Sequence, residues 1–341
     1  MVIARIIIVN FNSGIMLRRC LMALVEQTET QFEVIIVDNG SSDTSLAGLP
    51  NDPRLRILPL NQNIGFAGAS NRGFDGCTTP FAAFLNPDTV PDRGWLAALL
   101  QVADRFPEAA MFGSLQLCDD NPSVLDGAGD VYHCAGTAWR GGYLSPVPMP
   151  PPEGETFAPC AAAAMYRSEW FRQAGGFDER YFCYYEDVDL AFRVRLLGGR
   201  CLQVGDAVVR HVGSAVSGFA TPFTIYHLNR NQVWTFVKCM PGPLFWSLLP
   251  LHIIFVLICA LRTTSKCRNP AAWDGLRDCL RGLSYVWRQR RQIQRNRCVS
   301  WLYIARRIAW SPFAVTKRAI VLWPWEQPVG LPRTFSTAGG R

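Results

Sequence analysis

Charged residues are scarce in this 341-residue chain, at 18% of the sequence against 49% for hydrophobic residues. The chain is apolar for a soluble protein, yet it lacks the repeated long apolar runs of a protein that crosses a membrane many times. It has no internal repeat, which argues against a repeat architecture. Its length suffices for one large domain or two ordinary ones with a sizeable core.

Features of secreted proteins are also missing. The N-terminal stretch MVIARIIIVNFNS has only a short apolar run before a polar turn, so we expect a first strand and no signal peptide. None of the 12 cysteines forms a Cys-x-x-Cys pair, and we expect reduced cytosolic thiols packed as small hydrophobic residues.

Acidic residues are nearly absent from the last hundred positions. Residues 241–341 contain 16 Lys and Arg against 3 acids, whereas residues 1–240 contain 18 against 24. Seven of the 11 tryptophans share the basic part: Trp246, Trp273, Trp287, Trp301, Trp310, Trp323 and Trp325. This division suggests an enzyme-like body over residues 1–240 and an appendage over residues 241–341 for a membrane or a nucleic acid.

Strand and helix patterns alternate through the first 120 residues. The predicted strands are Ile6–Val9, Val34–Val37, Leu55–Leu58 and Phe81–Leu85, and the predicted helices are Ile15–Val25 and Trp95–Phe106. This alternation predicts an α/β fold with a doubly wound, mostly parallel sheet. Ligands of such sheets bind beyond the carboxyl ends of the strands.

The chain from residue 118 to 157 is rich in Gly and Pro, and we expect a long irregular excursion over the surface. A second sheet segment is expected at Ala158–Tyr166 and a further strand at Cys201–Val209. Phe223–Lys238 is the expected last helix of the globular body.

Polar turn residues follow each of the first four strands, and four such clusters in order indicate a nucleotide site. Asp38 ends a buried strand, where its carboxylate can accept hydrogen bonds from a pyrimidine base or cap a turn, and both roles stay open. Asn63–Gly76 places glycines at a helix start, which suits either a phosphate or tight packing. The stretch lacks the full G-x-G-x-x-G fingerprint, which excludes a nicotinamide site.

Two further positions suggest a metal ion. Asp88, in Asn86-Pro87-Asp88, follows an apolar strand and could bind Mg²⁺ or Mn²⁺ that bridges two phosphates, or simply form a turn. His211 follows a strand and precedes Gly213, so a neutral imidazole could complete the metal shell, or the residue could be structural.

Three carboxylates, Glu186, Asp187 and Asp189, fall within four residues at a helix start. Neighbouring carboxylates resist ionising together, although the dipole of a helix N-terminus favours each of them. Helical spacing puts Asp187 on one face with Leu190 and Val194 and lets the other two acids support loops or caps. The alternative is a well-capped amphipathic helix.

Together these stretches resemble a family-2 glycosyltransferase of the GT-A fold, most similar to the bacterial rhamnosyltransferase-like branch. The matching stretches span roughly residues 4–238: IIIVNFNSGIMLRRCL, VIIVDNGSSDTS, NIGFAGASNRG, FLNPDT, AGGFDERYFCYYEDVDLAFRVRLLG, HVGSAVSG and RNQVWTFVK.

The resemblance implies an inverting transfer from a nucleoside-diphosphate sugar to a hydroxyl of a glycan or lipid-linked glycan, with Mg²⁺ or Mn²⁺ and with dTDP-rhamnose as a candidate donor. It assigns a role to each matching position: donor binding to Asn10, Asp38, Asn63, Gly65 and Asn86, metal binding to Asp88 and His211, and general base to Asp187. Asn86 stands where many relatives have the first Asp of a D-x-D-type motif, which leaves one less charge for the metal.

The basic appendage is expected to attach to lipid. Pro243–Leu261 has 19 residues without a formal charge, but Pro250 and His252 interrupt it. A following stretch combines helically spaced Trp and Leu with arginines, which is typical of an interfacial membrane helix. A true membrane span and a buried helical subdomain stay open, whereas the apolar stretch and tryptophans favour lipid over nucleic acid.

The resemblance places the chain at the cytoplasmic face of the bacterial inner membrane, as a peripheral or monotopic protein in polysaccharide or O-antigen assembly. Two other functions remain. A nucleotidyltransferase would use the Asp88 metal without needing Asp187 as a base. A membrane-bound sugar-nucleotide binding protein would use neither for chemistry.

Overall fold

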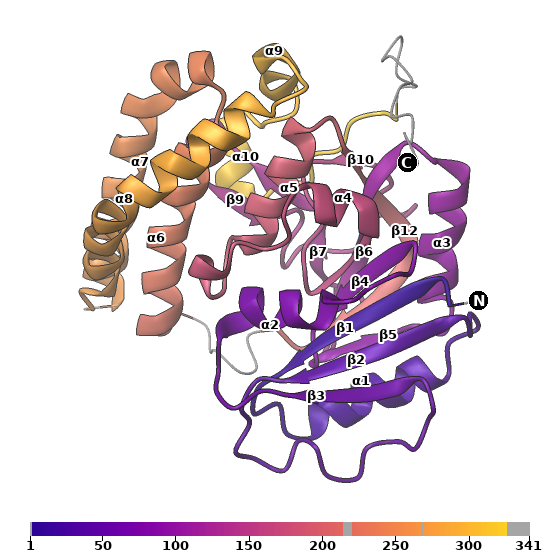
Figure 1. Ribbon diagram of the computed structural model, residues 1–341. Helices are drawn as coiled ribbons and strands as arrows, with labels where there is room; N and C mark the ends of the chain where they lie inside the picture. Colours follow the sequence, from indigo (N-terminus) through magenta and orange to yellow (C-terminus); the bar gives the residue numbers. More distant parts are fainter. Residues whose placement is uncertain (1, 214–219, 268, 326–341) are drawn as a thin grey trace, which may run out of the picture.

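A computed structural model describes residues 2–213, 220–267 and 269–325 (Figure 1). Within these residues, a ten-stranded sheet has the order β10-β12-β6-β11-β4-β1-β2-β3, with β5 paired to β12 and β7 to β6. Its strands are β1 (Ala4–Asn10), β2 (Phe32–Asp38), β3 (Leu55–Pro59), β4 (Phe81–Leu85), β5 (Thr89–Pro91), β6 (Ala109–Cys118), β7 (Leu125–Ala128), β10 (Gly154–Thr156), β11 (Ala163–Arg167) and β12 (Arg200–His211). A separate pair is formed by β8 (Asp130–Tyr132) and β9 (Ala138–Arg140).

The predicted α/β fold is confirmed. Strands β1 to β4 pair in parallel, as do β6 and β12, while β11 runs antiparallel between β4 and β6. The helices of this part are α1 (Ile15–Val25), α2 (Gly65–Phe74), α3 (Trp95–Arg105), α4 (Ser168–Gln173), a 3₁₀ turn at Glu179–Tyr181, and α5 (Glu186–Leu196).

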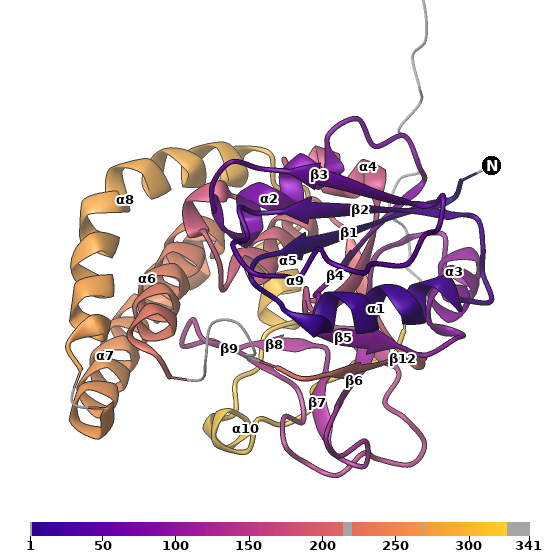
Figure 2. The ribbon, with the colours of Figure 1, turned by 90° about the horizontal axis from the view of Figure 1, so that it is seen from below.

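The central strands are covered on both faces because their side chains alternate between two cores. Ile6 and Ile8 of β1 pack with α1 and α3, whereas Ile7 and Val9 pack in the core that contains α2 and α5. Figures 1 and 2 show α1 and α2 on opposite sides of the β1–β2 region. At the edge, β3 is mostly exposed.

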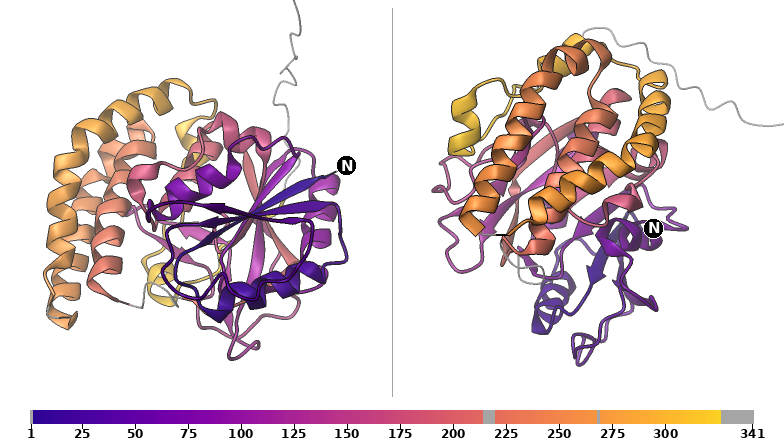
Figure 3. Two further views of the ribbon diagram at one scale, coloured as in Figure 1. Left: turned by 60° about the horizontal axis from the view of Figure 1, so that its bottom comes forward. Right: turned by 90° about the vertical axis from the view of Figure 1, so that its left-hand side faces the viewer.

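Long helices follow the sheet and form one side of the molecule (Figure 3). They are α6 (Pro222–Cys239), α7 (Gly242–Cys267) and α8 (Ala271–Arg295), followed by α9 (Trp301–Ala305) and α10 (Pro312–Lys317). Helix α7 continues through Pro250, although the proline removes one hydrogen bond, because buried Phe245 and Leu248 hold the helix against the body. Among the described residues α7 alone is long and apolar enough to cross a membrane, and 33% of its most apolar window is buried.

After α8 the chain returns to the sheet. Backbone bridges join His133 to Ala309 and Glu155 to Trp323. The buried Glu155 carboxylate also pairs with Arg307, at 3.2 Å, as well as with arginines of α5 and β12. The C-terminal helices therefore share one core with the sheet.

The prediction of an irregular excursion from residue 118 to 157 was wrong in part, since the segment contains β7, β8, β9 and β10. Each of these strands has only three or four residues and pairs with a partner distant in sequence or across a turn. Such short pairings have no local hydrophobic period by which the sequence could reveal them.

Candidate active site

Asn10 and Asp38 lie opposite each other at the ends of β1 and β2. The Asn10 side chain is fully buried, and its Nδ2 donates to Asp38 Oδ1 at 2.9 Å and to the hydroxyls of Ser41 and Ser45. The Ser13 hydroxyl donates to Asn10 Oδ1. Asn10 therefore holds the Asp38 side chain and the loop after β2 in place through buried hydrogen bonds.

Asn63 and Gly65 shape the entry to α2. Asn63 Oδ1 accepts hydrogen bonds from Asn39 Nδ2 and from the Gly65 N–H, both at 2.9 Å. Gly65 has a φ of +81°, and a β-carbon there would lie 2.5 Å from the Phe182 carbonyl oxygen. The start of α2 thus lies directly against the loop that carries Phe182 and leads into α5.

Asp88 and His211 lie together, because the end of β12 pairs with β5, which follows Asp88. His211 Nε2 is 3.3 Å from Asp88 Oδ1. On the other side of the imidazole, Nδ1 donates to Asp126 of β7 at 2.7 Å. Asp126 was not identified from the sequence, and it fixes the orientation of the ring.

This pair fits a divalent metal. His211 Nε2 is buried and has no hydrogen-bond partner among the described residues, while a carboxylate holds Nδ1, as is usual for metal-binding histidines. Burial lowers the pKa of His211, but the carboxylates of Asp126 and Asp88 outweigh burial and raise it to about 9. A metal ion bound at His211 must therefore displace a proton.

Asn86 stands two residues before Asp88, at the start of the predicted metal motif. Its N–H donates to the Ala162 carbonyl at 2.9 Å, and its carbonyl accepts from Thr89 Oγ1 at 2.7 Å. The half-buried side chain offers a neutral oxygen, so Asp88 is the single acid that this motif contributes.

The three acids of α5 lie in different surroundings. Asp187 is half-buried, and its two oxygens accept hydrogen bonds from the Ala161 N–H at 3.1 Å and the Val188 N–H at 2.8 Å. Glu186 is buried, and its Oε2 has no partner among the described residues. Burial raises the pKa of both carboxyl groups, well above the usual range for Glu186.

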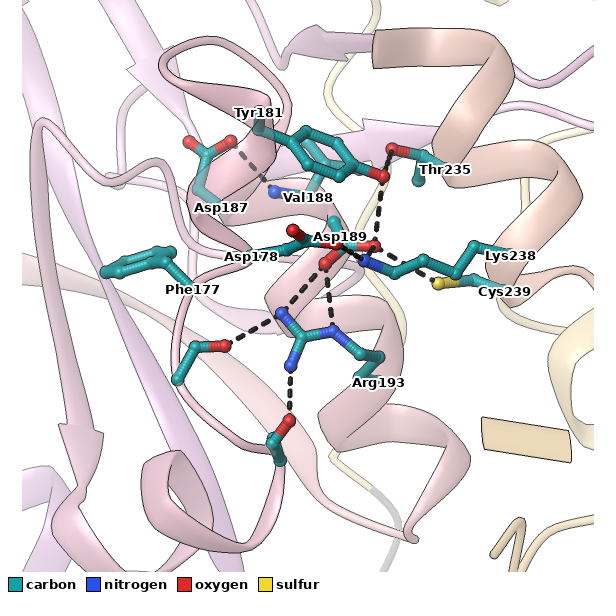
Figure 4. Close-up of polar contacts among 12 residues, drawn as sticks. Phe177, Asp178, Tyr181, Asp187, Val188, Asp189, Arg193, Thr235, Lys238 and Cys239 are labelled. Atoms are coloured by element: carbon teal, nitrogen blue, oxygen red, sulfur yellow. Dashed lines mark hydrogen bonds and ion pairs between the residues drawn. The ribbon is translucent and has the colours of Figure 1, made fainter. Parts of the chain in front are cut away.

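Asp189 belongs to a buried ionic network (Figure 4). It pairs with Arg193 at 2.8 Å and with Lys238 of α6 at 2.9 Å, and it accepts a hydrogen bond from the Tyr181 hydroxyl. Lys238 also pairs with Asp178 at 2.6 Å. A cavity of about 500 Å³ borders this network and does not include Asp88, Asp187 or His211 among its lining residues.

A strained loop precedes the acidic helix. Phe182, Tyr184 and Tyr185 all have φ between 67° and 68°, a region that residues other than glycine rarely adopt. Asn231 of α6, which is fully buried, holds this loop, because its Nδ2 donates to the carbonyl oxygens of Tyr181, Cys183 and Tyr184 at 2.7–3.1 Å. The sequence motif RNQVW contains Asn231, but its sequence position alone did not suggest this function.

Residues from the Gly-rich segment contact the Asp88–His211 pair at one end and lie next to Asp187 at the other. Arg140 of β9 forms an ion pair with Asp126 and stands opposite Asp130 in the β8–β9 ladder. Asp130 and Cys160 in turn each place a side-chain atom within 4.8 Å of an Asp187 oxygen. Neighbouring polar residues thus lead from His211 through Asp126, Arg140 and Asp130 to Asp187.

The stretch LDGAGD (residues 125–130) contained the missed acids, and its glycines were the available signal. Gly129 has a φ of +72°, and a β-carbon there would meet Thr156 Oγ1 at 2.4 Å. The glycine is needed to bring Asp130 into the site. In the predicted motif HVGSAVSG, residues 214–218 lie outside the described part of the chain.

The sequence model described as "Glycosyl transferase family 2" matches residues 5–175, which is half of the chain. An N-acetylglucosaminyl-diphospho-decaprenol L-rhamnosyltransferase of Mycobacterium tuberculosis is 32% identical over 235 residues, covering 60% of this chain and 75% of the relative.

Solved structures share the fold at low sequence identity. A mannosyltransferase from Pyrobaculum calidifontis, in complex with GDP-Man and Mn²⁺, has a TM-score of 0.52 at 18% identity and covers 86% of this chain and 84% of its own. TarS 1–349 of S. aureus, in complex with UDP-GlcNAc, has a TM-score of 0.54 at 15% identity and covers 86% and 89%. At these identities the likeness concerns the fold alone.

Proposed function

Since the chain belongs to glycosyl transferase family 2 and has a GT-A type fold, we propose that it moves a sugar from a nucleoside-diphosphate sugar to a hydroxyl of a glycan or lipid-linked glycan, with inversion at the anomeric carbon. The observation that carries the proposal is the series of neighbouring polar residues, Asp126, Arg140 and Asp130, that leads from the Asp88–His211 pair to Asp187. The Asp88–His211 pair could bind a metal ion and the diphosphate of the donor. Asp187 could accept a proton from a hydroxyl.

Asp187 is the proposed general base. Its two backbone N–H bonds orient the carboxylate, and it is open enough to meet an acceptor. As the acceptor oxygen bonds to the anomeric carbon, Asp187 takes the hydroxyl proton and the nucleoside diphosphate leaves with the electron pair of the broken C–O bond. A positioned base of this kind contributes roughly 10²–10⁴-fold to the rate.

Asp88 and His211 would hold Mg²⁺ or Mn²⁺, which when bound offsets the charge that develops on the leaving diphosphate. Asp126 keeps the imidazole oriented, and Arg140 holds Asp126. The proposed donor-binding residues are Asp38, Asn63, Gly65 and Asn86, together with Asn10, which holds Asp38. The donor sugar of the rhamnosyltransferase relative makes rhamnose the first candidate.

Residues 241–341 are the proposed membrane-associating part, and residues 1–240 the catalytic part, at the cytoplasmic face of a bacterial membrane. The support is the outer side of α7, where Trp246, Ile254 and Leu261 are 64%, 56% and 55% exposed. The outer side of α8 adds exposed arginines. An apolar stripe beside basic residues suits an anionic lipid surface and a lipid-linked acceptor.

The test is nucleotide release from a panel of sugar nucleotides that includes dTDP-rhamnose, with Mn²⁺, with Mg²⁺ and with a chelator. We expect release from one donor, dependent on metal and lost in Asp187→Asn but kept in Asp75→Asn, which changes an exposed acid. Equal release by wild type and Asp187→Asn would remove Asp187 as the base.

Release that needs a lipid-linked acceptor would identify that acceptor class. The absence of release from every donor, with that acceptor supplied, would instead favour a sugar-nucleotide binding protein. A nucleotidyltransferase would consume a nucleoside triphosphate, and its turnover would survive Asp187→Asn.

A further inference from the structure

Asp130 is buried next to Asp187 with an unpaired oxygen. It opens β8 and is 5% exposed, and its Oδ1 has no hydrogen-bond partner among the described residues. One atom each from the side chains of Asp130, Cys160 and Asp187 lies within 4.8 Å of the other two. A buried polar atom without a partner costs about 1–3 kcal/mol, so the arrangement points to a ligand at this position.

Resting on the proposed transferase function, we propose that Asp130 and Asp187 together bind the attacking hydroxyl of the acceptor. Asp187 accepts the hydroxyl hydrogen, and Asp130, as a neutral acid, donates a hydrogen bond to the hydroxyl oxygen. One oxygen at about 2.7 Å from each carboxyl group can join groups up to about 5.4 Å apart, and these two are closer.

The two contacts would orient the nucleophile. A hydroxyl oxygen has one hydrogen and two lone pairs. With the hydrogen directed to Asp187 and one lone pair directed to Asp130, only the second lone pair remains for the anomeric carbon. Alignment of this kind supplies a large share of the rate in many enzymes.

Asp130 is the member of the pair that holds a proton. Burial raises the pKa of Asp130 well above its usual range, and the charge of Asp187 raises it further, against the opposing effect of Arg140. Asp187 instead receives two backbone N–H bonds, which favour its ionised form. Two carboxyl groups this close do not both ionise readily.

The other titratable groups near the pair do not change this assignment. They are Asp126, Arg140, Cys160, Tyr166, Tyr185, Glu186 and Cys201, and burial raises the pKa of Glu186 as well. Burial raises the pKa of each of these thiols and phenols, so they are neutral at pH 7.

The proton count of the reaction is unchanged by Asp130. The acceptor O–H bond breaks and its proton goes to Asp187, the bond from the acceptor oxygen to the anomeric carbon forms, and the diphosphate leaves with its electron pair. Asp130 keeps its own proton throughout. Asp187 releases the transferred proton to water after the product has left.

The first experiment needs no substrate. The full chain labelled with [γ-¹³C]aspartate is titrated by NMR as wild type, Asp130→Asn and Asp187→Asn, with assignment by loss of each signal. We expect the Asp130 carboxyl to be protonated at pH 7, and its pKa to fall by one unit or more in Asp187→Asn. The proposal would be overturned if Asp130 were ionised at pH 6 and if its pKa were the same in wild type and in Asp187→Asn.

The second experiment measures release of nucleoside diphosphate with water as the probe nucleophile, from dTDP-rhamnose with Mn²⁺, across pH. Wild type should lose activity at high pH as Asp130 ionises. Asp130→Asn, whose amide still donates, should lose that alkaline limb and stay more active than Asp130→Ala, which should lose about 10- to 100-fold at all pH values. An unchanged alkaline limb in Asp130→Asn would overturn the assigned role.

The two experiments separate the two ideas. A coupled titration without turnover of any sugar nucleotide would overturn the transferase function and with it the hydroxyl ligand. Turnover of a sugar nucleotide together with an ionised Asp130 whose pKa does not depend on Asp187 would support the transferase function and contradict the role assigned to Asp130.

Discussion

Glu186, Asp187 and Asp189 carry the same charge in water, and each meets a different environment after folding. Burial raises the pKa of Glu186 well above its usual range, while for Asp189 the charges of Arg193 and Lys238 outweigh burial and lower it. Asp187 lies between these extremes, half-buried and held by N–H groups. One short acidic run thus contains a carboxyl group with a strongly raised pKa, an ion-paired carboxylate, and the partly exposed carboxyl group that we propose as the base.

Because its pKa is raised, Glu186 lowers the free energy of unfolding at neutral pH. The folded chain keeps a proton on Glu186 that the unfolded chain releases above about pH 4.3, so this residue lowers stability as pH rises. We expect Glu186→Gln to increase the free energy of unfolding at pH 7 by on the order of 1 kcal/mol or more. Urea unfolding at pH 7 and at about pH 3.5 checks the sign, since the difference should vanish at the lower pH.

Asp189 should behave in the opposite way. Asp189→Asn removes the anion between two buried cations, and breaking such a pair costs about 3–5 kcal/mol. Because the pKa of Asp189 is lowered in the folded protein, its contribution is present at neutral pH and is lost as pH falls. Asp75→Asn, in an exposed pair with Arg72, is the matched control and should change stability by less than about 1 kcal/mol.

At the scale of elements, helix α2, which carries proposed donor-binding residues, and helix α5, which carries the proposed base, meet through one loop. Gly65 touches the Phe182 carbonyl, and Asn231 of α6 holds the same loop from the other side. The backbone strain of this loop is therefore supported by two neighbours. The position of Asp187 depends on both of them.

This dependence predicts the effect of Gly65→Ala. The new β-carbon would lie 2.5 Å from the Phe182 oxygen, and the positive φ adds about 1–2 kcal/mol of strain. We expect a loss of about 2–4 kcal/mol in stability and a lower kcat, as the loop before α5 shifts. Thermal unfolding and nucleotide-release kinetics measure the two effects.

Gly76→Ala is the matched control, because Gly76 also has a positive φ, +66°, but nothing lies within 4 Å of its added β-carbon. Gly76→Ala should lower the stability only by the energy of the backbone strain, and it should leave kcat unchanged. Equal effects of both substitutions would mean that the contact with Phe182 does not position the loop.

Local patterns sufficed for the elements whose side chains face a core in regular order. Ile6–Val9, Ile15–Val25 and Phe81–Leu85 lie within or coincide with β1, α1 and β4. The resemblance brought Asp88 and His211 together, and the structure places them 3.3 Å apart. Asp126, Asp130 and Arg140 were missed because strands of three or four residues are too short to show a hydrophobic period, and only tertiary pairing places them.

At the scale of the whole molecule, the catalytic sheet and the C-terminal helices share one hydrophobic core. Val188 of α5, Phe236 of α6, Phe245 of α7 and Ile304 of α9 belong to the same buried cluster. The buried carboxylate of Glu155 also forms an ion pair with Arg307. A surface on α7 and α8 would therefore hold the active site at a fixed orientation, which suits an acceptor presented from a membrane.

The outward face of α7 gives the final prediction. Ile253, Ile254 and Leu257 are 48%, 56% and 42% exposed, whereas His252 and Val256 are buried against the body, so only one side of the helix is free for lipid. This one-sided exposure favours attachment in the plane of the membrane surface over a span. We expect Ile254→Glu with Leu257→Glu to reduce binding to phosphatidylglycerol-containing vesicles at least tenfold in co-sedimentation.

The control is Ile57→Glu on the edge strand β3, where the replaced side chain is 49% exposed and outside the α7–α8 face. It should leave vesicle binding unchanged. Binding should also weaken with salt and in vesicles of phosphatidylcholine alone, because the exposed Arg277, Arg281, Arg288 and Arg291 of α8 meet anionic headgroups. If the α7 variant bound vesicles like wild type but changed from dimer to monomer in light scattering, this face would join two copies of the chain and not a membrane.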